Sequence, residues 1–517
     1  MPIEPVEPKI TTERRLEVMG LSSQKELILG LDLGTSSLKG IFCSNSGEII
    51  AKYEVPIALR RNGDCVEQDG QAYLAALQEF VGACTRHPVQ KNLLARVVAI
   101  GLSGHTPSLI GIDKSGEPTF PVLIWQDNRA SQEATLLSEQ FGDPSLLVGT
   151  SLPWTPSGTA AKAMWVARHY PDRDAIARTR WLLQPKDFLG FHLTGAALSD
   201  PWSTKGLCNV RTGATLTDLL TFAGWDSRVV PQLLEGLSSR GKTTADCEAR
   251  FGIPKGIPVS VGWSDAMCGM LALGVFNKPL SFIITGTSAI VGTSTANEPM
   301  SDQPLYLIPH GSAPYPVVFG PTQMSGGSIS WAANLFSITE SELVERGDSD
   351  ESANVPTFLP YIAGERAPLW RNDIRGLYAN ISVEHGASAF ARSTMEGICF
   401  AERQVLELSQ KLSNAHVPEV IISGRAGNDP RWIKTRLRTM GQPLRFVDDL
   451  EITCRGSAIL AHTLLTNELS ASTAALTVSG ALHTPTPEDI AYGARNYERF
   501  LGEQQALLSK VSNATAP

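Results

Sequence analysis

The sequence lacks the features that mark disulfide-bonded, membrane-spanning and nucleic-acid-binding proteins. Its eight cysteines are scattered singly, with no CxxC pair and no paired histidines, so we expect neither a disulfide framework nor a structural zinc site, and a reducing cytoplasm fits. No run of about 18 apolar residues is present, and we therefore expect no membrane span. The net charge is -8 and no cluster of lysine and arginine offsets it, which disfavours nucleic acid as a partner.

The composition that is present is typical of a globular protein. Hydrophobic residues make up 42% and charged residues 19% of the 517 residues, which is enough to build a sizeable core. Residues 1–25 are rich in proline and charge and have no apolar centre, so we expect a flexible extension there and no secretory signal. We expect a second flexible segment at residues 506–517.

The segment Leu27–Ser44 has the pattern of a β-hairpin whose polar tip can bind phosphate. Apolar residues at alternate positions flank a turn of glycine, serine and threonine, and no helix follows, which argues against a Walker loop or a dinucleotide fingerprint. Small tip residues let backbone N–H groups and hydroxyls surround phosphate oxygens, and Asp32 can hold Mg2+ directly or through water. Taken alone, the segment is equally compatible with an ordinary hairpin that has a polar turn.

A second segment, Leu280–Thr293, repeats this pattern about half a chain later. An apolar strand ends at Thr285, the turn Gly286-Thr287-Ser288-Ala289 follows, and a second apolar strand begins. A repeat at this distance indicates a duplicated domain. We therefore expect two related lobes, with one phosphate-binding tip from each lobe facing a shared cleft.

Polar residues gather where two apolar strands of the first half end. One strand runs into His105 and Thr106, and the next runs into Trp125, Asp127 and Arg129. Ligands bind at such strand ends in α/β sheets. The Trp125 ring offers a flat wall for the carbon face of a sugar or polyol, and its polar neighbours offer hydrogen bonds to hydroxyl groups. A structural Asp–Arg pair beside a core tryptophan is the alternative interpretation.

Asp265 follows a predicted strand at residues 258–263 and precedes a predicted helix at residues 266–273. An aspartate at such a position can simply cap the helix. The functional alternative is that Asp265 is the base that receives the proton of a substrate hydroxyl. We expect the helix dipole to keep its carboxylate ionised, which suits phosphoryl transfer.

Two other segments of the first half have local patterns. Residues 157–165 open a helix, with Ser157 or Thr159 as its cap, and Lys162 on this helix is either a structural or a substrate-side cation. Residues 198–206 form a polar loop that either lines a pocket or crosses the surface.

In the second half, residues 385–408 have the spacing of a long amphipathic helix. A strand at residues 419–423 leads through a turn with Gly424 into a helix that ends near Met440. This turn can take adenine or ribose, or it can be a plain strand-to-helix connection.

Together these segments resemble the FGGY family of carbohydrate kinases, within the superfamily of sugar kinases, heat-shock ATPases and actin. LGLDLGTSSLK and ITGTSA resemble the two phosphate segments of the family, SVGWSDAMCGMLALG resembles the segment with the catalytic aspartate, and WQDNR resembles a substrate-side segment of glycerol and xylulose kinases. SGTAAKAMWVARH and RGLYANISVEHGASAFARSTMEGICFA resemble the two family signatures. The resemblance extends from about residue 27 to about residue 499, with the motifs in the family's order and spacing.

The resemblance implies an α/β fold with two ribonuclease-H-like domains, of the actin and hexokinase type, around a central cleft. The N-terminal domain is expected at residues 26–277, with the substrate side, the first phosphate segment and the catalytic aspartate. The C-terminal domain is expected at residues 278–505, with the second phosphate segment and the adenine side. The implied reaction moves the γ-phosphate of ATP to a hydroxyl of a small sugar, such as the pentulose xylulose, or of a polyol.

The resemblance also implies a role for individual residues, with Asp265 as the catalytic base. Contacts to ATP are implied for Asp32, Gly34, Thr35, Ser36, Lys39, Gly286, Thr287, Ser288, Gly424, Arg425 and Asn428. Substrate contacts are implied for His105, Thr106, Trp125, Asp127, Arg129 and Asp265, and Mg2+ contacts for Asp32 and Asp265.

Two segments depart from the family pattern. His105-Thr106-Pro107 stands where xylulose kinases usually carry Gln-Met-His, so ribulose, glycerol, erythritol and gluconate stay open as substrates. Ser423-Gly424-Arg425-Ala426 stands where three glycines and an alanine are usual, and Arg425 can lie flat against the base there.

Two alternatives come from other functional classes. A kinase-like sensor of sugar or nucleotide would have no need of the base, so the presence of Asp265 together with the phosphate segments favours turnover. An actin-like or chaperone-like ATPase is disfavoured because no filament-type insertion or separate peptide-binding domain is evident. A small sugar or polyol is the expected partner, and a homodimer is one assembly that the sequence allows.

Overall fold

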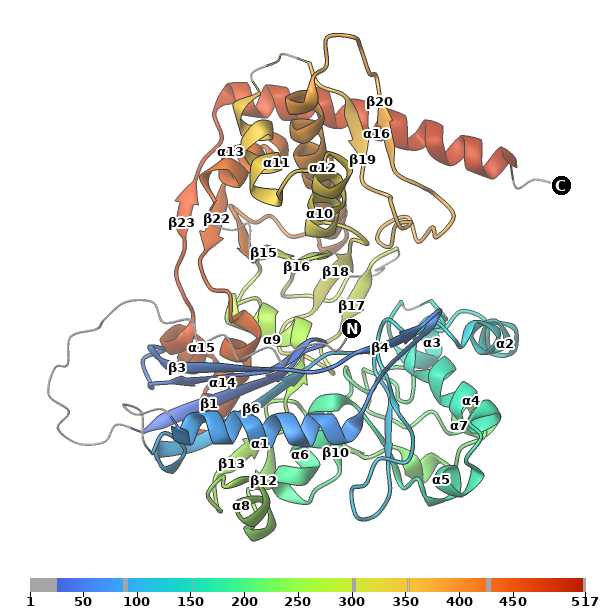
Figure 1. Cartoon of the computed structure of the whole chain (residues 1–517), viewed down its shortest axis with the longest axis vertical. Helices are drawn as coiled ribbons and strands as arrows, with labels where there is room; N and C mark the ends of the chain where they lie inside the picture. The colour runs from blue at the N-terminus through green and yellow to red at the C-terminus, as the bar shows by residue number, and fades with distance from the viewer. Residues whose placement is uncertain are drawn as a thin grey trace, which may run out of the picture.

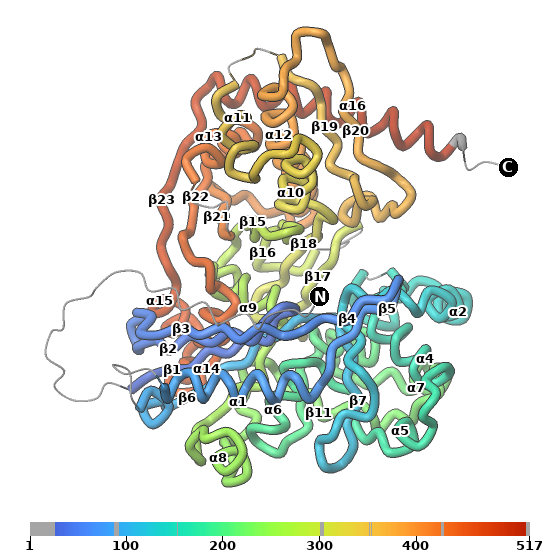
Figure 2. Tube along the Cα trace, in the orientation of Figure 1, coloured from blue at the N-terminus to red at the C-terminus, as the bar shows by residue number. Residues whose placement is uncertain are grey.

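The computed structural model describes residues 26–86, 92–151, 153–299, 304–350, 352, 354–424 and 429–514. The chain forms two lobes, and each is built on a seven-stranded sheet (Figures 1 and 2). The extension expected at residues 1–25 lies outside the described residues. None of the helices in the described part of the chain has the length and apolar character that a membrane span requires.

The first sheet has the expected three-stranded meander at one side. Its strands are β1 (Leu27–Leu33), β2 (Ser37–Cys43), β3 (Ile49–Pro56), β6 (Val97–Gly104), β12 (Ser239–Lys242), β13 (Pro258–Ser260) and β14 (Trp263–Ser264). Their order is β12-β13-β6-β1-β2-β3, with β14 also paired to β6. β1 runs antiparallel to β2 and parallel to β6, so a hairpin and a parallel strand meet at the centre of the sheet.

The second sheet repeats this arrangement. Its strands are β15 (Ser281–Thr285), β16 (Ala289–Ser294), β17 (Tyr306–Ile308), β18 (Val317–Pro321), β21 (Val420–Gly424), β22 (Leu444–Val447) and β23 (Ala481–His483). Their order is β17-β18-β16-β15-β21-β22-β23. β15 runs antiparallel to β16 and parallel to β21, as β1 does to β2 and β6. The two hairpins are therefore equivalent parts of two related sheets, as the repeated sequence pattern predicts.

Small sheets and helices surround the two large sheets. The remaining strands are β4 (Arg60–Asn62), β5 (Cys65–Gln68) and β8 (Val122–Leu123) in one sheet, and the pairs β7 (Ile110–Ile112) with β9 (Trp181–Leu183), β10 (Leu198–Ser199) with β11 (Gln232–Leu233), and β19 (Thr357–Leu359) with β20 (Leu377–Ala379). The helices of residues 26–277 are α1 (Gly70–Arg86), α2 (Ser131–Phe141), α3 (Ser145–Val148), α4 (Thr159–His169), α5 (Arg173–Arg178), α6 (Pro185–Thr194), α7 (Thr217–Ala223), α8 (Ala245–Phe251) and α9 (Asp265–Ala272), with short 3-10 turns η1 (Leu94–Arg96) and η2 (Ser227–Val229). Those that follow are α10 (Gly326–Leu335), α11 (Glu340–Ser349), α12 (Ala387–Ser413), α13 (Pro430–Met440), α14 (Ile452–Thr466), α15 (Leu469–Leu476) and α16 (Pro487–Ala514).

The alternation of side chains along β1 separates two cores. Leu29 and Leu31 are buried with α1 on one face of the sheet, whereas Ile28 is buried on the other face with residues of α9 and α14. Successive residues of a strand point to opposite faces, so Asp32 lies on the same face as Ile28. The carboxylate of the first phosphate segment therefore faces α14.

Helices α9 and α14 lie between the two sheets (Figure 1). α14 approaches the first sheet so closely that a Cβ atom at Gly30 would lie 2.1 Å, and one at Gly101 1.7 Å, from a carbonyl oxygen of α14. A Cβ atom at Gly456 of α14 would lie 1.9 Å from a carbonyl oxygen of α9. Glycine is required at these three positions. α14 and α15 thus pack on the first lobe, and the domain bounds expected at residues 26–277 and 278–505 stay a prediction.

Two local expectations differ from the structure. α16 continues as a helix to Ala514, where a flexible tail was expected from residue 506, because Leu507, Leu508 and Val511 pack beside the small core that includes Phe500. Gly158, which has no side chain, caps α4 in place of Ser157 or Thr159. The last three residues of the expected tail lie outside the described part of the chain.

Candidate active site

Asp32 lies near the end of β1 and is only 5% exposed. Its carboxylate accepts hydrogen bonds from Ser103 Oγ of β6 at 2.7 Å and from Thr453 Oγ1 of α14 at 2.8 Å. Burial raises the pKa of Asp32, and these two hydrogen bonds and the Lys39 ammonium oppose the increase. The second half of the chain thus helps to hold the carboxylate of the first phosphate segment.

Asp265 is the first residue of α9 and is partly exposed. The cap of this helix is Ser264, whose side chain accepts a hydrogen bond from the Met267 N–H, while Asp265 Oδ1 accepts from the Ala266 N–H at 2.7 Å. Burial and the carboxylate of Asp32 raise the pKa of Asp265 to about 7. The expectation that the helix dipole keeps Asp265 ionised is therefore wrong. Desolvation and the neighbouring like charge raise the pKa of Asp265 by more than the dipole lowers it.

The tip of each hairpin is closed by a backbone hydrogen bond from its glycine. The Gly34 N–H donates to the Ser37 carbonyl oxygen at 3.0 Å, and the Gly286 N–H donates to the Ser288 carbonyl oxygen at 2.8 Å. The first tip is exposed at Ser36, and the second tip is exposed at Gly286 and Thr287. Both turns are therefore open to a ligand, as phosphate binding by their N–H groups requires.

Neighbouring elements hold each tip in place. Backbone N–H groups of Ser325, Gly326 and Gly327, at the start of α10, donate to carbonyl oxygens of the second tip at 2.9 to 3.0 Å. Lys39 of β2 forms an ion pair with Glu451, just before α14, at 3.6 Å. In this arrangement the Lys39 ammonium is held toward α14, and its contact with nucleotide stays a prediction.

The adenine-side turn is described only at its start. Gly424 ends β21 with a φ of 116°, and a Cβ atom there would lie 2.2 Å from the Thr285 carbonyl oxygen, so the position requires glycine. Arg425 and Asn428 lie outside the described residues. The nucleotide contacts of all three residues stay predictions.

The segment after β8 combines one partly exposed aromatic ring with a buried ion pair. The indole N–H of Trp125 donates to Thr35 Oγ1 at 2.9 Å, which links this segment to the first phosphate tip. Asp127 is fully buried; its carboxylate accepts from the Val66 N–H at 2.7 Å and pairs with Arg129 at 2.7 Å. The carboxylate is thus satisfied within the protein, as the structural interpretation of this pair supposes. Substrate contacts of all three residues stay predictions.

His105 is 1% exposed, and both of its ring nitrogens have protein partners. Nδ1 lies 2.8 Å from Ser108 Oγ, and Nε2 lies 3.4 Å from the Tyr73 hydroxyl. Burial and the Lys162 ammonium lower the pKa of His105 to about 3, so the ring is neutral. Thr106 and Pro107 are the partly exposed residues of this loop, and a substrate contact from His105 would require the loop to move.

Family models and known proteins match the whole region that carries these segments. The N-terminal domain of the FGGY family of carbohydrate kinases matches residues 27–272, and the C-terminal domain of that family matches residues 281–465. The chain belongs to the FGGY family of carbohydrate kinases. It is therefore a sugar phosphotransferase of a family that uses ATP as the phosphate donor.

Relatives within the family are distant but cover most of the chain. A xylulose kinase from Staphylococcus xylosus is 25% identical over 79% of this chain and 84% of its own length. A gluconokinase from Bacillus licheniformis is 22% identical over 92% of this chain and 94% of its own length. A crystal structure of xylulose kinase from Rhodospirillum rubrum superposes with a TM-score of 0.83 at 20% identity, covering 94% of this chain and 100% of that one. The two-domain FGGY fold expected from the sequence is thus confirmed.

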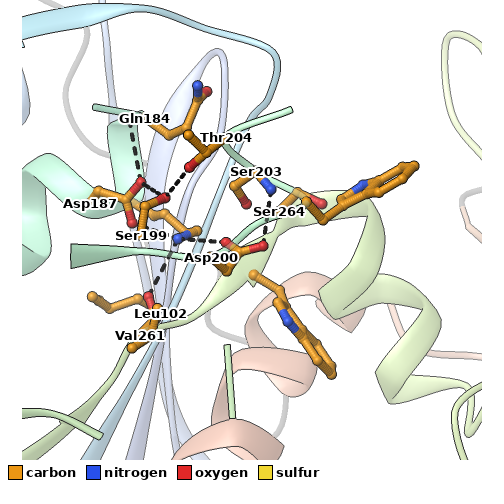
Figure 3. Close-up of polar contacts among 12 residues, drawn as sticks. Leu102, Gln184, Asp187, Ser199, Asp200, Ser203, Thr204, Val261 and Ser264 are labelled. Atoms are coloured by element: carbon orange, nitrogen blue, oxygen red, sulfur yellow. Dashed lines mark hydrogen bonds and ion pairs between the residues drawn. The ribbon is translucent and has the colours of Figure 1, made fainter. Parts of the chain in front are cut away.

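A buried charge network that sequence reasoning did not identify lies beside this kinase site (Figure 3). The Lys186 ammonium pairs with Asp187 at 2.5 Å and with Asp200 at 2.9 Å, and all three side chains are at most 1% exposed. Burial would lower the pKa of Lys186, but the two carboxylates outweigh it and raise the pKa. Ser199 Oγ and the Ser203 N–H complete the network through hydrogen bonds at 2.6 and 2.9 Å. The polar loop 198–206 therefore lines the interior of the protein. Its two serines and its aspartate, close together in the sequence, are the pattern from which the network could have been predicted.

Lys205, on the same loop, was also missed. Its ammonium lies 5.0 Å from the centre of the Trp202 ring, and it interacts electrostatically with Asp200 and Asp265. Burial lowers the pKa of Lys205 to about 8, against the effect of these two carboxylates. A cation thus stands beside the predicted base.

The sequence leaves open whether Lys162 is a structural or a substrate-side cation, and its contacts are those of a structural cation. It is fully buried and donates to the carbonyl oxygens of Pro107 at 3.0 Å and of Ile124 at 2.7 Å. Pro107 belongs to the first substrate-side loop, and Ile124 precedes Trp125 of the second. One side chain thus ties the two loops together.

Proposed function

We propose that this protein is an ATP- and Mg2+-dependent kinase that transfers the γ-phosphate of ATP to a hydroxyl of a small sugar, a pentulose such as xylulose, or a polyol. The observation that carries the proposal is the placement of Asp32 and Asp265 at the ends of β1 and β14, which both pair with β6 at Ser103, so that the charge of Asp32 acts on Asp265. Two exposed turns, one from each lobe, would bring backbone groups of their tips to the phosphates.

In this proposal Asp265 receives the proton of the attacking substrate hydroxyl. Its Oδ1 is held by the Ala266 N–H, which orients the carboxylate, and Oδ2 takes the proton. A base works best when its pKa is close to the working pH, and the pKa of Asp265 is about 7. Positioning of the hydroxyl against the γ-phosphate supplies the rest of the rate enhancement.

Asp32 and Asp265 are the residues that would hold Mg2+. The fit is supported by the pKa of Asp265, which burial and then the charge of Asp32 raise, because a cation between two such carboxylates relieves their repulsion. Mg2+ is commonly held by one or two carboxylates together with substrate phosphates and water. When bound, it would neutralise charge on the transferring phosphate.

The substrate would lie against the partly exposed Trp125 ring and Thr106, and Asp265, which follows β14, would receive its hydroxyl proton. Asp127 and Arg129 would support this wall from behind. The relatives named xylulose kinase favour a pentulose. A sugar acid such as gluconate is the second candidate, because the Lys205 ammonium beside Asp265 can pair with a carboxylate and the gluconokinase relative covers 92% of the chain.

A panel assay that couples ADP release to NADH oxidation tests the proposal. The panel contains D-xylulose, ribulose, glycerol, erythritol and gluconate. Sugar-dependent ADP release with one of them is the expected result, and a kinase-like sensor would bind ligand without release. A cytoplasmic location and a homodimer stay predictions; light scattering after size-exclusion chromatography tests the dimer.

A further inference from the structure

Gln68, the last residue of β5, connects the first phosphate tip to the interior of the first lobe. It is 1% exposed. Its side-chain N–H2 group donates to the Thr35 carbonyl oxygen at 2.7 Å, and its Oε1 accepts from the Tyr73 hydroxyl at 2.8 Å.

The hydrogen bonds beyond Gln68 run in a single direction. The Tyr73 hydroxyl gives its only proton to Gln68, so it accepts from His105 Nε2 at 3.4 Å. Because the neutral His105 ring donates from Nε2, its Nδ1 accepts from Ser108 Oγ at 2.8 Å. The donors therefore run from Ser108 through His105, Tyr73 and Gln68 to the phosphate tip, and a change at the substrate-side loop alters the bond that orients Gln68.

A second connection reaches the same tip from the other substrate-side loop. The Trp125 indole N–H donates to Thr35 Oγ1 at 2.9 Å. β5 also fastens that loop, since the Val66 N–H donates to Asp127 at 2.7 Å and Glu67 pairs with Arg129 at 2.7 Å. Three successive residues of β5 thus hold the substrate-side loop or the phosphate tip.

We propose that Gln68 is a positioning residue that couples sugar binding to nucleotide binding. The inference rests on the proposed function, which puts phosphate at the Thr35 tip and sugar at Trp125 and Thr106. A sugar that orders the two loops orders the Thr35 tip through Gln68 and Trp125, so the nucleotide binds more tightly in its presence. Coupling of this kind is reciprocal, and the nucleotide strengthens sugar binding by the same factor.

The test is a comparison of binding constants by calorimetry. The dissociation constant of the Mg2+ complex of the non-hydrolysable analogue AMP-PNP is measured with and without the sugar that gives the most ADP release in the panel. For the unmodified protein we expect the sugar to tighten nucleotide binding about tenfold, within the range of about 5- to 150-fold that is usual for linked sites. Gln68→Leu and Gln68→Met are expected to reduce this factor to about threefold or less, because neither side chain has a donor for the Thr35 carbonyl oxygen.

The design separates positioning from stability. Gln504→Leu is the matched control, because Gln504 is also a buried amide (5% exposed) and bonds to Tyr361 and Gln404 in the other lobe. It should lower the melting temperature and leave the coupling factor at about tenfold. Tyr73→Phe keeps the bond from Gln68 to Thr35 and removes the link to His105; it should give an intermediate factor, and it replaces the Gln68 variants if they do not fold.

Each outcome has a separate meaning. Gln68 variants that keep the full coupling factor overturn the inference. So does an unmodified protein that binds the nucleotide with the same affinity with and without the sugar. An unmodified protein that binds no nucleotide, or releases ADP with no sugar of the panel, overturns the proposed function and this inference with it. A coupling factor that falls equally in the Gln504 control assigns the effect to general stability and also overturns the inference.

Discussion

Substitution of Gly101 by alanine tests the packing that joins the two halves of the site. A Cβ atom at this position of β6 would lie 1.7 Å from the Ser457 carbonyl oxygen and 2.5 Å from the carbonyl carbon. Both are backbone atoms, and real Cβ contacts stay beyond 3.0 Å, so α14 must shift by more than 1 Å. Overpacking of this kind costs about 3 kcal/mol, the upper part of the range for enlarged core residues.

The shift also reaches the site, because Thr453 on α14 donates to Asp32 at 2.8 Å. We expect Gly101→Ala to lower the turnover number on the order of 100-fold, the effect of a misplacement of about 1 Å. Unfolding by urea, followed by tryptophan fluorescence, and the ADP-release assay measure the two effects. Gly502→Ala is the control, since nothing lies within 4 Å of a Cβ atom there and alanine favours the helix α16. A Gly101→Ala protein with the urea midpoint and turnover of the unmodified protein would refute this account of the packing.

Three further predictions follow from the charged groups. Because the pKa of Asp265 is raised to about 7 and its ionised form is the base, kcat/KM should fall as the pH drops below about 7; a profile that is flat from pH 5 to 8 would contradict this. A carboxyl whose pKa is higher in the folded than in the unfolded state contributes stability at low pH, and this contribution is lost as the pH rises from about 4 through about 7. At pH 8 the Asp265→Asn variant should therefore melt at a higher temperature than the unmodified protein. An equal or lower melting temperature would refute the raised pKa. Lys186→Met leaves Asp200 buried without its cation and Asp187 with only Arg240 at 3.9 Å, and should destabilise the protein by about 3–5 kcal/mol; melting within 1 °C of the unmodified protein would show that the Lys186 pairs contribute nothing.

The features that the sequence predicts correctly are local ones. The strand–turn–strand pattern at Asp32 and its repeat at Thr287 require only neighbouring residues, and the structure places both at equivalent hairpins. The helix after Asp265 is likewise a local pattern, and its true cap, Ser264, is the adjacent residue. The helical end of the chain could also have been found, because Leu507, Leu508 and Val511 have helical spacing.

The features that the sequence does not reveal depend on contacts between distant segments. The return of α14 to the first sheet joins Thr453 to Asp32 across most of the chain, and the small residues that permit it have no distinctive local pattern. The raised pKa of Asp265 depends on burial and on Asp32, neither of which is visible in its own segment. The burial of His105 depends in the same way on Tyr73 of α1.

The measurement that tests the central claim most directly is sugar-dependent ADP release by the unmodified protein and by Asp265→Asn. We expect release with at least one sugar, polyol or sugar acid of the panel, and a decrease in turnover by a factor on the order of 100 to 10,000 in the variant, with AMP-PNP binding nearly unchanged. Release that Asp265→Asn leaves near normal would remove Asp265 from the mechanism, and the absence of release with every sugar of the panel would contradict the proposed kinase.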